Sequence, residues 1–292
     1  MSSVTRVVRT REALAAAYAE LPRPAIRSAR ATRAAVFTMG ALHDGHMALV
    51  RAARGEVGSE GHVTVTIFVN PLQFGAGEDL DRYPRDLKGD IELCAAEDVD
   101  LVFAPGVDVM YPDGEPQTRV EAGALGSILE GSARPGHFSG MLTVVLKLLN
   151  LTAPDATFFG EKDYQQLTLV RRMVADFNLT TKVHGVPTLR ESDGLARSSR
   201  NRYLSPSDRD LASQIPRALA AGVTTADLGR SGEAIVGAVE VELTRVGLTP
   251  DYVALTAPDL GPAPVEGPAR ILVACPVGGV RLIDNTPVVL RR

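Results

Sequence analysis

The chain of 292 residues is long enough to bury one large domain or two unequal ones, and its 45% hydrophobic content excludes disorder along the whole length. Its 31 Lys and Arg against 35 Asp and Glu give a formal net charge of -4. This balance leaves no chain-wide basic field for nucleic acid, so any anion-binding site must be local. The two cysteines, Cys94 and Cys275, are too few for a disulfide framework or a cysteine-rich zinc site, and we expect two buried thiols in a reducing compartment.

The first 30 residues contain no unbroken apolar stretch of the signal-peptide kind, and nowhere in the chain do 18 consecutive apolar residues occur. We therefore expect a cytoplasmic protein with no membrane partner. Glu12 and Glu20 argue against a transit peptide, and the segment from Thr10 to Leu21 is predicted to be a surface helix.

Short apolar runs alternate with longer amphipathic stretches as far as residue 187, which is typical of a parallel sheet wrapped by helices. The apolar runs predict strands at 34–38, 63–70, 101–105, 156–160 and 182–187. Apolar residues at three- and four-residue spacing predict helices at 46–54, 87–97, 141–151 and 164–177.

The pattern changes after residue 187. A polar stretch over 190–205 is followed by predicted helices at 207–221 and 233–246 and by predicted strands at 252–256, 270–274 and 280–283, with Gly278 and Gly279 as a hairpin turn. The sequence therefore predicts a doubly wound α/β domain with a parallel, Rossmann-like sheet over residues 1–187, and a smaller C-terminal α+β domain over residues 188–292.

The segment 37–46 (FTMGALHDGH) lies where a predicted strand ends and a helix begins. Open α/β sheets bind ligands beyond the carboxyl ends of their strands, and amide groups at a helix start can receive phosphate oxygens. Gly40 and Gly45 permit tight turns, while His43 and His46 are three residues apart and can face the same anion. The alternative is that both histidines only cap or pack. Zinc is disfavoured because the other three histidines show no ligand spacing with this pair.

The segment 158–166 (FFGEKDYQQ) has the same character, because an apolar strand stops and a helix follows. Lys162 can reach a phosphate as a mobile charge, and Asp163 can either cap the helix or accept a ribose hydroxyl. Gln165 and Gln166 can also be ordinary residues of the helix surface, which is the interpretation we favour for Gln165.

A third segment, 195–201 (LARSSRN), places polar side chains in a loop at the predicted domain boundary. Ser198 and Ser199 can donate hydrogen bonds to a polyphosphate, and Arg200 can neutralise charge that grows in a transition state. Taken alone, the same residue types are typical of a surface loop.

A fourth segment, 67–74 (IFVNPLQF), ends a predicted buried strand with two amide side chains, Asn70 and Gln73. An uncharged amide can form a fork for a substrate hydroxyl or carboxylate. A simple turn is the alternative.

Five segments, taken together and in order, resemble the pantothenate synthetase (pantoate-beta-alanine ligase) family: MGALHDGH, FVNPLQF, GEKDYQQL, DGLARSSRN and RYLS. The closing RLIDN at 281–285 is similar to the C-terminal end of that family. The resemblance extends over residues 34–286, and several ordered motifs are far more specific than one. It implies membership of the nucleotidylyltransferase-like superfamily, which includes the class I aminoacyl-tRNA synthetases. The implied activity is the ATP-dependent condensation of (R)-pantoate with beta-alanine to pantothenate, AMP and pyrophosphate, through a pantoyl adenylate.

The same resemblance implies roles for individual residues. His46 would be the proton donor, with His43, Lys162 and Arg200 completing the catalytic set. Gln73 and Gln166 match the family's pantoate-binding glutamines, and we add Asn70 to the substrate-binding residues. The ATP-binding residues implied are Met39, Gly40, Ala41, Leu42, His43, Asp44, Gly45, His46, Gly160, Glu161, Lys162, Asp163, Leu189, Arg197, Ser198, Ser199 and Arg200.

The resemblance also implies Mg²⁺, with Asp90 as a candidate ligand or partner of a ligand water, and a homodimer without a nucleic-acid partner. Two positions depart from the family's usual pattern: Arg197 stands where Met or Leu precedes the serines, and Phe37 stands where Pro is usual. A cation at Arg197 can add a phosphate contact, and Phe37 can narrow the pantoate pocket.

Three other functions are alternatives to this one. A nucleotidylyltransferase acting on a phosphorylated acceptor would need more basic residues around 70–74 than the sequence has. A non-catalytic nucleotide sensor would bind ATP without releasing pyrophosphate. A tRNA ligase is disfavoured because the chain is short and acidic and lacks a basic, aromatic-bearing segment for RNA.

Overall fold

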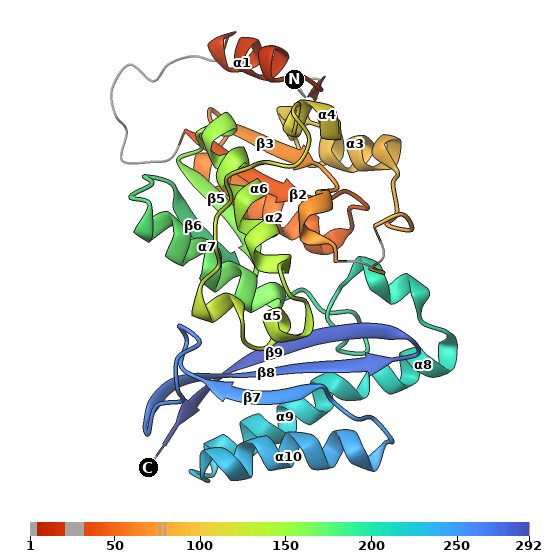
Figure 1. Ribbon diagram of the computed structural model, residues 1–292. Coiled ribbons are helices and arrows are strands. Elements are labelled where there is room, and N and C mark those ends of the chain that lie inside the picture. Colours follow the sequence, from red (N-terminus) through yellow and green to blue (C-terminus); the bar gives the residue numbers. More distant parts are fainter. Residues whose placement is uncertain (1–4, 21–31, 76, 79, 292) are drawn as a thin grey trace. The chain divides into compact units, whose positions relative to one another are not determined.

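The computed structural model describes residues 5–20, 32–75, 77, 78 and 80–291 (Figure 1). The chain divides into two compact units, each with its own sheet. Unit 1 comprises Met1–Gly160 and Leu169–Val186, and unit 2 comprises Glu161–Thr168 and Pro187–Arg292. The short segment Glu161–Thr168, which follows the fifth strand along the chain, therefore belongs with the C-terminal unit.

Unit 1 is built on a six-stranded parallel sheet with the strand order β1-β4-β3-β2-β5-β6. From β2 the chain fills one side of the sheet with β3 and β4 and then the other side with β5 and β6, so the topological switch point lies between β2 and β5. This arrangement confirms the predicted doubly wound fold. The strands are β1 (Arg6–Val8), β2 (Arg33–Thr38), β3 (His62–Ile67), β4 (Leu101–Phe103), β5 (Ala156–Gly160) and β6 (Lys182–Val186).

Helices cover both faces of this sheet. On one face, Val36 of β2 shares a buried cluster with Met47 and Val50 of α2 and with Cys94 of α3. Because side chains alternate along a strand, Ala35 faces the opposite side, and it is also buried. The helices are α1 (Arg11–Glu20), α2 (Asp44–Val57), α3 (Leu87–Ala96), α4 (Val107–Met110), α5 (Glu130–Ala133), α6 (His137–Thr152) and α7 (Tyr164–Asp176), with single 3₁₀ turns η1 (Pro71–Gln73) and η2 (Ala124–Gly126).

Unit 2 is an α+β unit, as predicted, with a three-stranded antiparallel sheet in the order β7-β8-β9. Two helices pack on this sheet through buried residues such as Leu219, Val239 and Ile271. Gly278 and Gly279 have φ of +56° and +76° and form the predicted hairpin turn. The elements are η3 (Glu161–Asp163), η4 (Ser199–Tyr203), α8 (Pro206–Ala212), α9 (Gln214–Asp227), α10 (Gly232–Arg245), β7 (Tyr252–Thr256), β8 (Gly267–Val277) and β9 (Val280–Leu290).

Some predicted boundaries are wrong. The single helix predicted at 207–221 is two helices, α8 and α9, because the ring of Pro216 would clash with the carbonyl of Ala212 in a continuous helix. The strand predicted at 63–70 stops at Ile67, since its partner β2 ends at the paired residue Thr38. Leu21, the predicted end of the first helix, lies outside the described residues.

Both cysteines are buried free thiols, as expected. Among the described residues, the structure contains no helix with the length and apolar character needed to cross a membrane.

Candidate active site

The turn between β2 and α2 is fixed by a buried carboxylate. Asp90 of α3, only 3% exposed, accepts the amide N–H groups of Ala41 at 3.0 Å and of Leu42 at 2.7 Å, one on each oxygen. Gly40 has φ of +81°, and a Cβ at this position would lie 2.9 Å from Asp90 Oδ2 and 3.1 Å from Ile67 Cγ2. The sharp turn therefore requires glycine and an acceptor beneath it.

The two histidines of this segment form a reciprocal cap at the start of α2. His43 Nδ1 accepts the amide of Gly45 at 3.1 Å, and His46 Nδ1 accepts the amide of His43 at 3.3 Å. The ring centroids are 4.2 Å apart. An Nδ1 that accepts a hydrogen bond carries no proton, so each neutral ring presents Nε2 as an N–H donor.

Capping and phosphate binding are therefore compatible for this pair, because they use different ring nitrogens. Three of the amides that were expected to receive phosphate oxygens have partners inside the protein. The N–H groups of Ala41, Leu42 and Gly45 already donate within the protein. A phosphate near this turn would meet the side chains of His43 and His46 rather than these three amides.

The 3₁₀ turn η1 follows β3 and fixes Gln73. Asn70 Nδ2 donates to Gln73 Oε1 at 3.0 Å and to the Gly140 carbonyl at 3.2 Å, while Asn70 Oδ1 accepts the hydroxyl of Tyr111 at 2.8 Å. Gln73 Nε2 donates to the sulfur of Met39 at 3.2 Å. Asn70 is only 1% exposed, and its contact with Gln73 fixes the orientation of the Gln73 side chain.

A second group of side chains holds the backbone of the same turn. His137 Nδ1 lies 2.8 Å from the carbonyl of Gln73, and Arg134 donates to that carbonyl at 3.4 Å and to the carboxylate of Glu78 at 2.5 and 2.9 Å. Burial and, secondarily, the charge of Arg134 lower the pKa of His137. His137 and Arg134 could not be assigned a role from the sequence, because their spacing in ARPGHFSG carries no recognisable signal.

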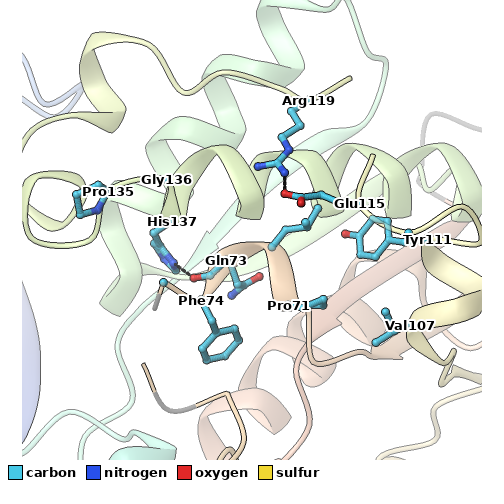
Figure 2. A pocket seen from close by; sticks show the side chains of 13 residues that line it. Pro71, Gln73, Phe74, Val107, Tyr111, Glu115, Arg119, Pro135, Gly136 and His137 are labelled. Atoms are coloured by element: carbon cyan, nitrogen blue, oxygen red, sulfur yellow. Dashed lines mark hydrogen bonds and ion pairs between the residues drawn. The ribbon is translucent and has the colours of Figure 1, made fainter. Parts of the chain in front are cut away.

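A cavity of about 490 Å³ borders this turn within unit 1 (Figure 2). Gln73 is the predicted substrate-binding residue that lines it, and none of the predicted ATP-binding residues does. The other lining residues are Pro71, Leu72, Phe74, Gly75, Val107, Tyr111, Gly114, Glu115, Arg119, Pro135, Gly136 and His137.

The segment after β5 begins at Gly160, the last strand residue, and continues as the turn η3 in unit 2. Lys162 Nζ donates to Asp163 Oδ1 at 3.3 Å, and the Lys162 side chain is 18% exposed. The prediction of a surface position for Gln165 is wrong. Gln165 is buried because it lies on the face of α7 that also carries Leu169, whereas Gln166 is partly exposed.

The loop that leads into η4 contains the remaining predicted residues. The backbone N–H of Arg197 donates to the carbonyl of Leu189 at 2.9 Å, and Ser198 caps η4 by accepting the amide of Arg200 at 3.3 Å. Ser199 is the first residue of η4. The hydroxyl of Ser198 therefore has a structural role as a cap in addition to any contact with phosphate.

Each unit thus assembles its own set of predicted residues. Unit 1 brings together the β2–α2 turn, Asp90 and Gln73 through direct contacts. Unit 2 carries Lys162, Gln166 and the 197–200 segment. Within the described ranges, no group of three or more His, Cys, Asp or Glu side chains is placed to hold a metal ion.

A family model described as pantoate-beta-alanine ligase matches residues 6–287. The chain belongs to the pantoate-beta-alanine ligase family. It is 53% identical over 289 residues to a pantothenate synthetase of Salinispora arenicola, covering 98% of this chain and 99% of that protein. It is 56% identical over 249 residues to a pantothenate synthetase of Mycolicibacterium paratuberculosis, covering 85% and 79% of the two chains.

Two solved structures of pantoate-beta-alanine ligases share the fold. Pantothenate synthetase from Thermus thermophilus superposes with a TM-score of 0.87 at 48% identity, covering 97% of this chain and 99% of that one. The ligase from Francisella tularensis, crystallised with beta-gamma ATP and beta-alanine, has a TM-score of 0.77 at 36% identity, with 97% of each chain covered. The chain is therefore an enzyme of the class that forms C–N bonds.

Proposed function

We propose that this chain condenses (R)-pantoate with beta-alanine at the expense of ATP and releases pantothenate, AMP and pyrophosphate. Membership of the pantoate-beta-alanine ligase family is the observation that carries the proposal. The names of its relatives and the ligands of the Francisella tularensis enzyme support it. The reaction needs ATP because a carboxylate is a poor electrophile until one of its oxygens becomes part of a good leaving group.

The proposed reaction has two steps. In the first, a carboxylate oxygen of pantoate attacks the α-phosphorus of ATP, and the bond from that phosphorus to the bridging oxygen breaks to release pyrophosphate. In the second, the unprotonated amine of beta-alanine attacks the acyl carbon of pantoyl adenylate and expels AMP, while the amine loses a proton. No covalent bond to the protein is required, so catalysis consists of alignment and charge stabilisation, and alignment alone can contribute about 7–11 kcal/mol.

The donors for the nucleotide come from three segments. The Nε2–H groups of His43 and His46 would bind the phosphates as neutral donors, since both Nδ1 atoms serve as caps. Lys162 and Arg200 would stabilise the charge that develops on pyrophosphate. The remaining residues implied for ATP would shape its site: Met39–Asp44, Gly45, Gly160, Glu161, Asp163, Leu189 and Arg197–Ser199.

Pantoate would be held by amide side chains. The oxygen of Gln73 accepts from Asn70, so Gln73 presents its amide nitrogen, which suits a carboxylate or hydroxyl oxygen. We assign the same function to Gln166, which is partly exposed in unit 2. Asn70 has the supporting task of fixing the orientation of Gln73.

Magnesium is part of the proposal as a companion of the nucleotide. When bound, Mg²⁺ would neutralise phosphate charge, and it commonly takes one or two carboxylates plus phosphate oxygens rather than a complete protein cage. The described residues suit only that arrangement, because they contain no cluster of three ligand side chains. Both oxygens of Asp90 accept backbone amides, so Asp90 would more readily act through a bound water than as a direct ligand.

We further propose that residues 1–187 bind ATP and pantoate while residues 188–292 act as a lid that protects the adenylate from water. The enzyme would work in the cytoplasm as a homodimer, without a nucleic-acid partner. Sedimentation equilibrium of the purified chain tests the dimer.

Isotope exchange between labelled pyrophosphate and ATP tests the proposed first step. The exchange should require pantoate and should proceed without beta-alanine, because the adenylate forms before the amine reacts. AMP should accumulate only when both pantoate and beta-alanine are present, and it should form in a one-to-one ratio with pantothenate. ATP binding with no exchange would favour the nucleotide sensor, and exchange supported only by a phosphorylated acceptor would favour another nucleotidylyltransferase.

A further inference from the structure

The turn η3, which carries Lys162, is held by side chains from the C-terminal hairpin. Asn285 of β9 donates through Nδ2 to two successive carbonyls, those of Glu161 and Lys162, each at 2.9 Å. Arg270 of β8 donates to the carboxylate of Glu161 at 3.2 Å and to Asn285 Oδ1. We propose that Asn285 and Arg270 are positioning residues that aim Lys162 at the nucleotide, an inference that rests on the proposed function of Lys162.

Within unit 2, Arg270 contacts both Asn285 and Tyr164, which lie at the two ends of η3. The guanidinium of Arg270 lies 3.6 Å from the ring centroid of Tyr164, the first residue of α7, and the hydroxyl of Tyr164 donates to the carbonyl of Pro258 at 2.8 Å. Asn285 Oδ1 accepts from Arg270, so its Nδ2 is directed at the turn. Both ends of η3 are therefore fixed, one through its carbonyls and the other through the ring of Tyr164.

The hairpin is itself anchored at this point. Asp284 accepts two hydrogen bonds from Arg190, at 2.6 and 3.0 Å, and accepts the amide of Asn285 at 2.7 Å. The side chain of Asn285 thus extends from a strand position that has little freedom to shift. Rigid support of this kind is what holds a catalytic group near its productive geometry.

The chemistry of the contacts that Asn285 and Arg270 make with η3 indicates that these residues position the turn rather than stabilise the fold in general. Arg270 is only 7% exposed, and a buried ion pair is weak evidence for stability because desolvation offsets much of the attraction. A pair of apolar residues would fill the same space. What apolar residues cannot do is fix two carbonyls and a carboxylate of one turn in a defined direction, and a misplacement of about 1 Å can cost about a hundredfold in rate.

A double-mutant cycle on ATP affinity, measured by isothermal titration calorimetry with the full chain, tests the inference. We expect Asn285→Ala to raise the Kd for ATP about tenfold, which corresponds to about 1.4 kcal/mol. In a chain that already carries Lys162→Ala, the same substitution should change the Kd less than about twofold, because the group it positions is gone. Equal effects of Asn285→Ala in both backgrounds, or no effect in the wild-type background, would overturn the inference.

Three further variants make the result specific. Arg281→Ala removes an ion pair with Asp251 from the same strand β9, and it should leave the Kd unchanged. Asn285→Asp keeps the size of the side chain and the acceptor for Arg270 but loses the donor, so it replaces Asn285→Ala if that variant unfolds. Arg270→Lys keeps the charge but loses the planar fork, and it should also weaken ATP binding.

The outcomes separate the two proposals. If Lys162→Ala leaves ATP affinity and pyrophosphate exchange at wild-type values, the proposed function of Lys162 fails, and the positioning inference fails with it. If Lys162→Ala weakens binding while Asn285→Ala and Asn285→Asp do not, only the positioning inference fails.

Discussion

Gly40 has a positive φ, and a Cβ added there would press against Asp90 and Ile67. Gly40→Ala should lower the free energy of unfolding by about 1–2 kcal/mol from the backbone alone, and displacement of Asp90 should weaken ATP binding as well. Gly55→Ala in α2 is the matched control, because nothing lies within 4 Å of its Cβ position. That helical substitution should raise the free energy of unfolding by about 0.5–1 kcal/mol. Urea denaturation of both variants provides the measurement, and equal stability would contradict the assignment.

Asp90 can be tested as a structural acceptor against its predicted part in binding Mg²⁺. In Asp90→Asn, only one oxygen remains for the amides of Ala41 and Leu42, so the free energy of unfolding should fall by about 1–3 kcal/mol even in EDTA. Unchanged stability in EDTA, combined with a higher Mg²⁺ requirement for pyrophosphate exchange, would instead identify Asp90 as a metal ligand.

At the level of elements, the turn η1 is held against α6 by hydrogen bonds of His137 and Asn70. Burial and Arg134 lower the pKa of His137, so between that lowered value and the ordinary 6.5 the unfolded chain binds more protons than the folded one. The stability that neutral His137 contributes to the folded state is therefore complete above pH 6.5, and it is lost as the pH falls through the lowered pKa. The free energy of unfolding should decrease from pH 7 to pH 5.

His137→Asn keeps a donor for the Gln73 carbonyl but cannot titrate in this range. Its free energy of unfolding should consequently depend less on pH between 7 and 5 than that of the wild-type chain. Urea titrations at four pH values would provide the comparison. Parallel curves for the two proteins would show that His137 does not carry the pH dependence.

The strength of local signals determined which elements could be predicted. The strand β5 and the turn at Gly278 and Gly279 were predicted correctly, because apolar runs between turn residues are local signals. The early end of β3 could not be predicted, since it depends on where β2 turns away. Pro216 is a local signal for the break between α8 and α9. The break was missed because the apolar residues keep a helical spacing across it.

Within the candidate site, the sequence identified the motifs, Asp90 and the RLIDN segment, but not the contacts by which Asp90, Arg270 and Asn285 support the other segments. Asp90, Arg270 and Asn285 act on segments that lie between 48 and 124 positions away along the chain. Contacts over such separations leave no periodicity and no spacing rule. The paired histidines were recognisable because they lie three residues apart, beside two glycines, where a predicted strand ends. Their shared use of Nδ1 as a cap required coordinates.

At the level of the whole molecule, the proposed function requires both units to meet one nucleotide. Hydrogen exchange followed by mass spectrometry tests this requirement. ATP with Mg²⁺ should slow exchange in peptides that cover residues 39–46, 160–166 and 197–201, whereas α10 (Gly232–Arg245) should show no change. Protection confined to the segments of one unit would contradict a shared site.

Attack of a carboxylate oxygen on the α-phosphorus of ATP is the step on which the proposed chemistry depends. Pantoate labelled with ¹⁸O in both carboxylate oxygens distinguishes it from the alternatives in a single mass-spectrometric measurement. One labelled oxygen should appear in AMP and one should remain in the amide carbonyl of pantothenate, with none in pyrophosphate. Label in inorganic phosphate together with the formation of ADP, or AMP without label, would contradict the adenylate mechanism.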